Sequence, residues 1–186
     1  MFPINLNTTL AIDLLIDKQA PELADLIEKN RLHLRQWLAW LDHSRSVDDS
    51  LKFINESNEK WKNRSALTLG ILLNKTLVGV INYHQFNWQQ GTASIGYWLD
   101  ADRQGRGIIS KACYALINLG FSELDLRTIT ISCAEKNFKS QTVPRRLGFL
   151  EQETIKDKEW LYDHHVNHIV FRMTRELWYK SGGTKE

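Results

Sequence analysis

The sequence predicts a mixed α/β domain in which helices cover both faces of one sheet. Three observations lead to this fold class. Short apolar runs with the alternation typical of strands are separated by longer stretches with the three-and-four spacing of amphipathic helices. Hydrophobic residues make up 42% and charged residues 25% of the 186-residue chain, as in ordinary soluble domains. Internal repeats and long linkers are absent, so we expect one domain over residues 1–180 and a polar tail over 181–186.

The N-terminal part is expected to contain one strand followed by two helical segments. Apolar and polar residues alternate over Thr9–Ile16, which indicates a half-buried strand. Asp17 and Pro21 open a helical stretch, and its apolar stripe comprises Leu34, Trp37, Leu38 and Leu41. A second helix is expected over Val47–Asn63.

A hairpin and a further strand are expected next. The apolar runs Leu67–Leu73 and Leu77–Tyr83 are separated by Asn74 and Lys75, a pattern typical of a tight turn. Thr92–Asp100 then reads as another strand. The first half of the sheet would therefore be built from neighbouring segments of the chain.

The C-terminal half is expected to contain two helices, one strand and a final hairpin. Gly107–Glu123 shows the clearest helical pattern of the chain, and Thr128–Ala134 alternates like a strand. A short helix should end before Gly148, and Pro144 favours a late start for it because proline removes an intrahelical hydrogen bond. The last hairpin should run to about Met173 and turn near 162–164.

Charge and composition exclude several classes of protein. The 24 basic and 22 acidic residues leave a net charge of +2, which is too balanced to predict direct nucleic-acid binding. No apolar run approaches the roughly 18 residues that span a bilayer, and the first residues lack the basic region of a secretion signal, so we expect a cytoplasmic protein without membrane contact. Cys113 and Cys133 lie in apolar stretches and are expected to be buried reduced thiols.

The segment from Asp100 to Ser110 is the sharpest local feature, because it joins a predicted strand to the best predicted helix. Gly105 and Gly107 let the backbone approach a ligand closely, and the first amides of a helix can bind a diphosphate. Arg103, Arg106 and Lys111 add positive charge. The alternative is a glycine-containing helix start that binds no ligand.

Two other nucleotide-binding motifs do not fit this loop. A Walker loop requires four residues between its glycines, whereas one residue separates Gly105 from Gly107. A dinucleotide fingerprint would place its third glycine at position 110, which is Ser110.

The loop does match the pattern Gln/Arg-x-x-Gly-x-Gly/Ala, although Asp102 stands at its first position. In this pattern and in element order the chain resembles the GNAT N-acetyltransferase superfamily, and it is most similar to the RimL-like branch, the ribosomal-protein-serine acetyltransferases. The segments that carry the narrower resemblance are 30–40, Gly96-Tyr97-Trp98-Leu99, 105–110, Asn137-x-x-Ser140 and Leu147-Gly148-Phe149. The resemblance implies the GNAT fold, with a mostly antiparallel sheet whose fourth and fifth strands splay apart.

The resemblance also implies an acetyl-CoA-dependent enzyme without a metal. The pantetheine arm would enter between the splayed strands, and the Leu99 amide would face the thioester oxygen. The residues expected to bind the coenzyme are Tyr97, Trp98, Leu99, Arg103, Gln104, Gly105, Arg106, Gly107, Ile108, Ile109, Ser110, Asn137 and Ser140.

Two catalytic residues follow from the same resemblance. Glu159 falls at the position of the branch's general base, and Ser140 would donate a hydrogen bond to the departing sulfur because Pro144 replaces the tyrosine used by many GNAT enzymes. The alternatives are a solvent-facing strand glutamate for Glu159 and a helix-capping role for Ser140 or Asn137.

The acceptor is expected to be an amine that reacts in its neutral form. About a tenth of an α-amine with a pKa near 8 is neutral at pH 7, against under a thousandth of a lysine amine. We therefore expect a protein N-terminus, such as that of a ribosomal protein, with Trp37, Trp40 and Trp160 at the acceptor pocket. The alternatives are a small amine such as a polyamine or antibiotic, or a coenzyme-binding module without turnover. The resemblance further implies a homodimer, and His164, His165 and His168 are expected to form a polar turn.

Overall fold

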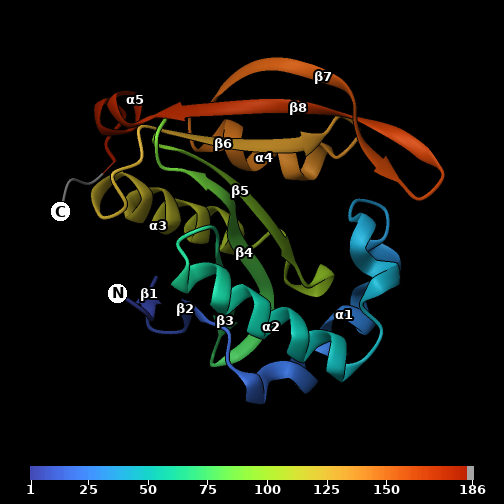
Figure 1. Ribbon diagram of the computed structural model, residues 1–186. Helices are drawn as coiled ribbons and strands as arrows, with labels where there is room; N and C mark the ends of the chain where they lie inside the picture. The colour runs from blue at the N-terminus through green and yellow to red at the C-terminus, as the bar shows by residue number, and fades with distance from the viewer. Residues whose placement is uncertain (184–186) are drawn as a thin grey trace. The chain divides into compact units, whose positions relative to one another are not determined.

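The computed structural model describes residues 1–183, so residues 184–186 of the expected tail lie outside the described part. The strands of this part form one mixed sheet in the order β1-β2-β3-β4-β5-β6-β8-β7 (Figure 1). Their bounds are β1 Ile4–Asn5, β2 Leu10–Leu14, β3 Leu67–Leu73, β4 Thr76–Asn87, β5 Thr92–Leu99, β6 Thr128–Ala134, β7 Leu150–Leu161 and β8 His164–Thr174. β5 and β6 are parallel, with Thr92–Ile95 opposite Thr128–Ile131, and β1-β2, β2-β3, β6-β8 and β7-β8 pair antiparallel.

The chain forms two compact units. The first contains Met1–Asn82 and Tyr97–Ala112, and the second contains Tyr83–Gly96 and the chain from Cys113 onward. The helices are α1 Ala20–Leu34, α2 Val47–Lys62, α3 Ile108–Ser122, α4 Phe138–Arg146 and α5 Arg175–Lys180, and short 3-10 turns lie at η1 Asp17–Gln19, η2 Ala39–His43 and η3 Ala101–Arg103. None of the helices within residues 1–183 is long and apolar enough to cross a membrane.

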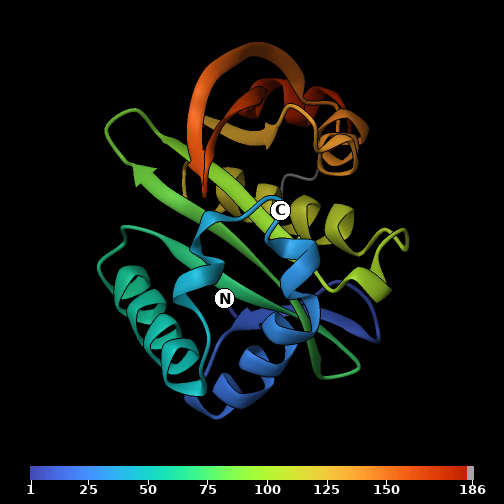
Figure 2. The ribbon, with the colours of Figure 1, turned by 90° about the vertical axis from the view of Figure 1, so that its right-hand side faces the viewer.

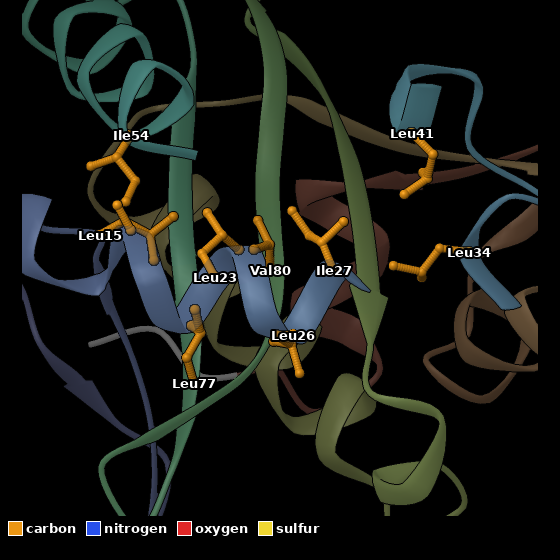
Figure 3. Close-up of a cluster of buried hydrophobic side chains, with 10 residues drawn as sticks. Leu15, Leu23, Leu26, Ile27, Leu34, Leu41, Ile54, Leu77 and Val80 are labelled. Atoms are coloured by element: carbon orange, nitrogen blue, oxygen red, sulfur yellow. The ribbon is translucent and has the colours of Figure 1, made fainter. Parts of the chain in front are cut away.

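The core of the first unit forms where α1 and α2 pack together, the two helices drawn in blue and teal in Figure 2. Leu23 and Ile27 project from α1, Ile54 from α2 and Val80 from β4, and Figure 3 shows these side chains converging. The spacing of the α1 residues places them on one helical face. This packing fixes α1, which in turn supports the loop after β5.

The apolar stripe expected to continue α1 is wrong beyond Leu34, where the helix ends. Leu38 has an extended backbone, with φ −128° and ψ 114°, and Leu41 is then fully buried from the 3-10 turn η2. The Arg31 guanidinium holds this turn by donating to the carbonyl oxygens of Leu41 and Ser44, each at 2.7 Å. The leucine spacing therefore reflects core packing that persists after the helix has stopped.

The second unit is built on β6, β8 and β7, which lie side by side in Figure 1. Phe171 and Met173 of β8 are fully buried. On β4, the buried Tyr83 hydroxyl donates to the Leu116 carbonyl of α3 at 2.8 Å. Cys113 and Cys133 are buried thiols that form no disulfide within residues 1–183, as expected, and burial raises the pKa of the Cys113 thiol.

Two helices of this unit differ from expectation. Pro144 lies inside α4, so the late helix start is wrong; the helix begins at Phe138 and loses only the one hydrogen bond that a proline nitrogen cannot donate. Helix α5 was not expected. It begins after Thr174, whose hydroxyl accepts from the Leu177 amide at 3.2 Å, as an N-cap residue does.

Candidate active site

The loop after β5 turns sharply at its two predicted glycines. Gly105 has φ +74° and Gly107 has φ +72°, a left-handed conformation that favours glycine. Helix α3 then begins at Ile108, and the Lys111 amide donates to the Gly107 carbonyl at 3.0 Å. By helix geometry, the amides that precede Lys111 at this end lack acceptors within the helix and are suited to hold an anion.

Helix α1 anchors this loop through contacts that sequence reasoning missed. Lys29 bridges two carboxylates, with its Nζ 2.8 Å from Asp100 and 2.7 Å from Asp102. The Ala101 amide donates to the Asn30 side-chain oxygen at 2.9 Å. The residues involved are about 71 positions apart, so no local sequence pattern predicts the contact. The loop therefore keeps its shape through tertiary contacts of its own unit.

The buried carboxylate of Asp100 is the centre of this anchor, with 4% of the residue exposed. Burial alone would raise its pKa, but hydrogen bonds from Lys29, the Asp102 amide and Asn30, together with the Lys29 charge, outweigh burial and lower the pKa. Hydrogen bonds to Asp100 and Asp102 raise the pKa of Lys29. Both groups are thus held in their charged forms.

We expect Asp100 to stabilise the fold at neutral pH but not in acid. Because its pKa is lowered in the folded state, its contribution is present above the unfolded value of about 3.9 and is lost as the pH falls through the folded value. The difference in melting temperature between wild type and Asp100→Asn should be largest near pH 7 and shrink below about pH 4. The exposed Asp125→Asn serves as control, and a difference that grows in acid would contradict this assignment.

The loop fits a group that carries two phosphates. A Cβ built on Gly105 or Gly107 meets nothing within 4 Å, so both glycines border open space. Within the described residues, the buried Nε of Arg103 has no hydrogen-bond partner, which suits an arriving anion. Arg106 is exposed beside the loop, and Gln104 is held by His33 at 2.8 Å. Ile108 is buried, whereas Ile109 and Ser110 are half-buried.

The strand end before the loop is tightly packed. Leu99 is buried, Tyr97 is half-buried, and Trp98 packs on the core of the first unit and on Trp40, with ring centroids 6.5 Å apart. Trp37 is half-buried in the turn after α1. The structure thus brings Trp40 and Trp98 together, while contacts of the Tyr97–Leu99 backbone with a pantetheine arm and the splay of the strands stay predictions.

In the second unit, Asn137 and Ser140 both lie at the start of α4, where the sequence offered each of them as a capping residue. The Asn137 side-chain oxygen caps α4 by accepting from the Ser140 amide at 3.1 Å. The Ser140 hydroxyl instead lies 3.3 Å from the Cys133 sulfur. The N-cap residue of α4 is therefore Asn137.

A β-bulge sets the position of Glu159 on β7. Ile155 lies opposite His168 and Glu159 opposite Val166, so three residues of β7 face a single residue of β8. Within the bulge Asp157 has φ +50°, and its amide donates to the Asn167 side-chain oxygen at 3.0 Å. A bulge re-aims the side chains beside it and is common near active sites. Glu159 is consequently not a simple solvent-facing strand residue.

Glu159 contacts a histidine that sequence reasoning had assigned to a polar turn. The Glu159 carboxylate, with 35% of its side chain exposed, lies 3.0 Å from Nε2 of His168, whose side chain is 15% exposed. His164, His165 and His168 all lie in β8, so the expected polar turn of these three residues is wrong. The sequence did contain a signal for this contact, because a hairpin that turns at Tyr162 and Asp163 places positions 159 and 168 near each other. Trp160, exposed, packs edge-on against His165 at 4.8 Å.

Comparisons with known proteins show the family to which the chain belongs. The family model for the acetyltransferase (GNAT) domain matches residues 10–150. The ribosomal-protein-serine acetyltransferase of Escherichia coli (strain K12) is 32% identical over 160 residues, which cover 86% of this chain and 89% of that protein.

Two solved structures are also similar. RimL, a ribosomal L7/L12 alpha-N-protein acetyltransferase in complex with coenzyme A, has a TM-score of 0.90 and 26% identity over 94% of this chain and 99% of its own. The microcin C7 self-immunity acetyltransferase MccE, in complex with acetyl-CoA and AMP, has a TM-score of 0.89 and 29% identity over 92% of this chain and 96% of its own. The expected resemblance is thereby confirmed: the chain belongs to the GNAT family and is an acetyl-CoA-dependent N-acetyltransferase.

Proposed function

We propose that this enzyme acetylates the N-terminal α-amine of a protein, with a ribosomal protein as the preferred acceptor. The observation that carries the proposal is the carboxylate of Glu159, which is partly exposed beside a bulge and held by His168 at 3.0 Å. The name of the Escherichia coli relative, a ribosomal-protein-serine acetyltransferase, supports a serine residue, and that of RimL, an alpha-N-protein acetyltransferase, supports the α-amine as the acceptor.

The pKa of the acceptor amine favours an N-terminal α-amine over a lysine side chain. An ammonium has no lone pair, so a base must first remove one proton. An α-amine with a pKa near 8 needs only a modest base at pH 7, whereas a lysine amine near 10.4 is far harder to deprotonate. A single carboxylate such as Glu159 suits the first task, because it can take the proton directly or through one water.

The loop at Gly105 and Gly107 would hold the diphosphate of the donor. Its backbone amides and the unpartnered Arg103 Nε provide hydrogen bonds to negative oxygens. Bound acetyl-CoA supplies the acetyl group as a reactive thioester. Asn137 and the Tyr97–Leu99 backbone are the other groups that we expect along the coenzyme.

Ser140 would donate a hydrogen bond to the departing sulfur. Its hydroxyl lies 3.3 Å from the sulfur of Cys133, so it is already placed to interact with a sulfur atom, and Asn137 is the N-cap of α4. A serine hydroxyl is much less acidic than a thiol, so it stabilises the thiolate without giving up its proton, and solvent completes the protonation.

A panel of acceptors tests the proposal. Purified enzyme should release thiol from acetyl-CoA with a peptide that begins with serine, and mass spectrometry should place the acetyl group on the α-amine. The matched control is the same peptide with a blocked N-terminus and one internal lysine, which should give less than about a hundredth of the rate because so little of its amine is neutral. Equal rates on both peptides would overturn the assignment of the acceptor.

The second candidate is a small amine, favoured by the similarity to MccE, whose structure is a complex with acetyl-CoA and AMP. Competition separates the two: a polyamine or an aminonucleotide with the higher kcat/KM would replace the peptide as the substrate. We place Trp37, Trp40 and Trp160 as contacts of the acceptor in either case. A ribosomal acceptor implies action in the cytoplasm, and the expected homodimer stays a prediction.

A further inference from the structure

Three polar side chains from adjacent strands of the second unit form a continuous chain of contacts. The Ser132 hydroxyl on β6 lies 3.0 Å from Nδ1 of His168 on β8. The other ring nitrogen, Nε2, lies 3.0 Å from the Glu159 carboxylate on β7. Figure 1 shows these three strands side by side. Both ring nitrogens of one histidine are therefore engaged, each with a side chain from a different strand.

The sheet register explains why these side chains meet. Ser132 lies opposite Val170, and Ala134 opposite His168, so the Ser132 and His168 side chains point to the same face from neighbouring positions. On the other side, Ile155 lies opposite His168, and the bulge then lets Glu159 reach the same ring. If β7 had no bulge, Asp157 would lie opposite Val166. The Glu159 carboxylate would then lie two residues further along β7.

Elementary chemistry fixes the proton positions. An ionised carboxylate can only accept, so Nε2 of His168 must carry the hydrogen that faces Glu159. In the neutral ring, Nδ1 is then an acceptor and receives the Ser132 hydroxyl hydrogen. Glu159 therefore sets the neutral tautomer that carries its hydrogen on Nε2, and the Ser132 hydroxyl complements this tautomer by donating to Nδ1.

We propose that His168 is a positioning residue for Glu159 and that Ser132 holds the His168 ring by a hydrogen bond at Nδ1; this inference rests on the proposed role of Glu159 as the base. The hydrogen bond holds Oε2 of the carboxylate and, within residues 1–183, is the only hydrogen bond of that side chain. The second oxygen, Oε1, is left to receive the proton from the acceptor amine. One N–H bond of the ammonium breaks and an O–H bond forms on Glu159. The neutral amine then forms the C–N bond as the C–S bond breaks, and the second proton that the nitrogen loses passes to solvent, which protonates the departing thiolate.

His84 on β4 is a second histidine near Glu159. Desolvation lowers its pKa even though part of the residue is exposed, and the charge of Glu159 acts in the opposite direction. The His84 side chain makes no hydrogen bond to another described residue, in contrast to that of His168. We therefore assign the positioning role to His168 and not to His84.

Two amide substitutions separate positioning from simple packing. In His168→Gln the side-chain amide nitrogen coincides with Nε2 and can still donate to Glu159. In His168→Asn the amide reaches only as far as Nδ1, so the bond to Glu159 is lost. We expect His168→Asn to lower kcat by about 10- to 100-fold with the KM for acetyl-CoA unchanged, and His168→Gln to restore most of kcat. Ser132→Ala should lower kcat by about fivefold, as for one neutral hydrogen bond.

Controls keep the outcomes distinct. His164→Gln, at the exposed end of β8, should keep wild-type kcat, and circular dichroism with melting curves checks that each variant is folded. In a Glu159→Gln background, His168→Asn should have no further effect. If Glu159→Gln is slow while His168→Asn equals wild type, the positioning role is overturned and the base survives. If Glu159→Gln itself keeps full activity, the proposed base fails instead. Equal losses in the Asn and Gln variants would indicate packing alone.

Discussion

Glu159→Gln is expected to reduce kcat on an N-terminal peptide by about 100- to 10,000-fold, the usual contribution of a positioned general base. The glutamine keeps the shape of the side chain and can still meet His168, so the variant should fold normally. It cannot take a proton, because an amide is not basic at neutral pH. The KM for acetyl-CoA should change little, since the diphosphate loop belongs to a different part of the chain.

The pH dependence gives this experiment a second readout. The neutral fraction of the acceptor amine rises with pH until the pH exceeds the amine's pKa of about 8. The slow variant depends entirely on amine that is already neutral, so its disadvantage against wild type should shrink between pH 7 and pH 9. A loss that stays constant over that range would show that Glu159 supports the structure and does not remove a proton. Glu153→Gln, exposed on the same strand, is the matched control.

Much of the fold could be predicted because its signals are local. Asn74 and Lys75 stand between two apolar runs, and both adopt the positive φ, 51° and 67°, that a tight hairpin turn requires. The loop at Gly105 and Gly107 is local as well, since glycine spacing after a strand and before a helix announces it. The chemistry of that loop followed from residues that are adjacent in the chain.

The rest depends on contacts between distant residues. The helical stripe was extended past Leu34 because buried leucines keep the same spacing in the 3-10 turn that carries Leu41. The anchor from Lys29 to Asp100 spans 71 positions. The contact between His168 and Glu159 requires the bulge at Asp157, which shifts the register by two residues. The hydrophobic periodicity of a single segment cannot predict where this helix ends, the Lys29 anchor or the bulge.

Gly107→Ala is expected to raise the KM for acetyl-CoA by about 10- to 100-fold, the equivalent of losing one charge-assisted hydrogen bond. The new methyl group would project into the open space beside the loop, where no protein atom lies within 4 Å apart from those of Gly107 and its two neighbours in the chain. The methyl group would therefore not clash with the protein itself, but it would clash with a bound diphosphate. A larger side chain at this position should have a larger effect.

The folded protein should tolerate the same change at a modest cost. Alanine at φ +72° is strained by about 1 kcal/mol, and the melting temperature should fall by a few degrees. Gly182→Ala is the matched control, because Gly182 also has a positive φ, +95°, and nothing within 4 Å of its built Cβ. The two variants should lose similar stability, yet only Gly107→Ala should lose affinity for acetyl-CoA, measured by titration calorimetry as well as by KM. Equal coenzyme affinity in the two variants would mean that the diphosphate binds elsewhere, because backbone strain alone would then account for everything that the methyl group does.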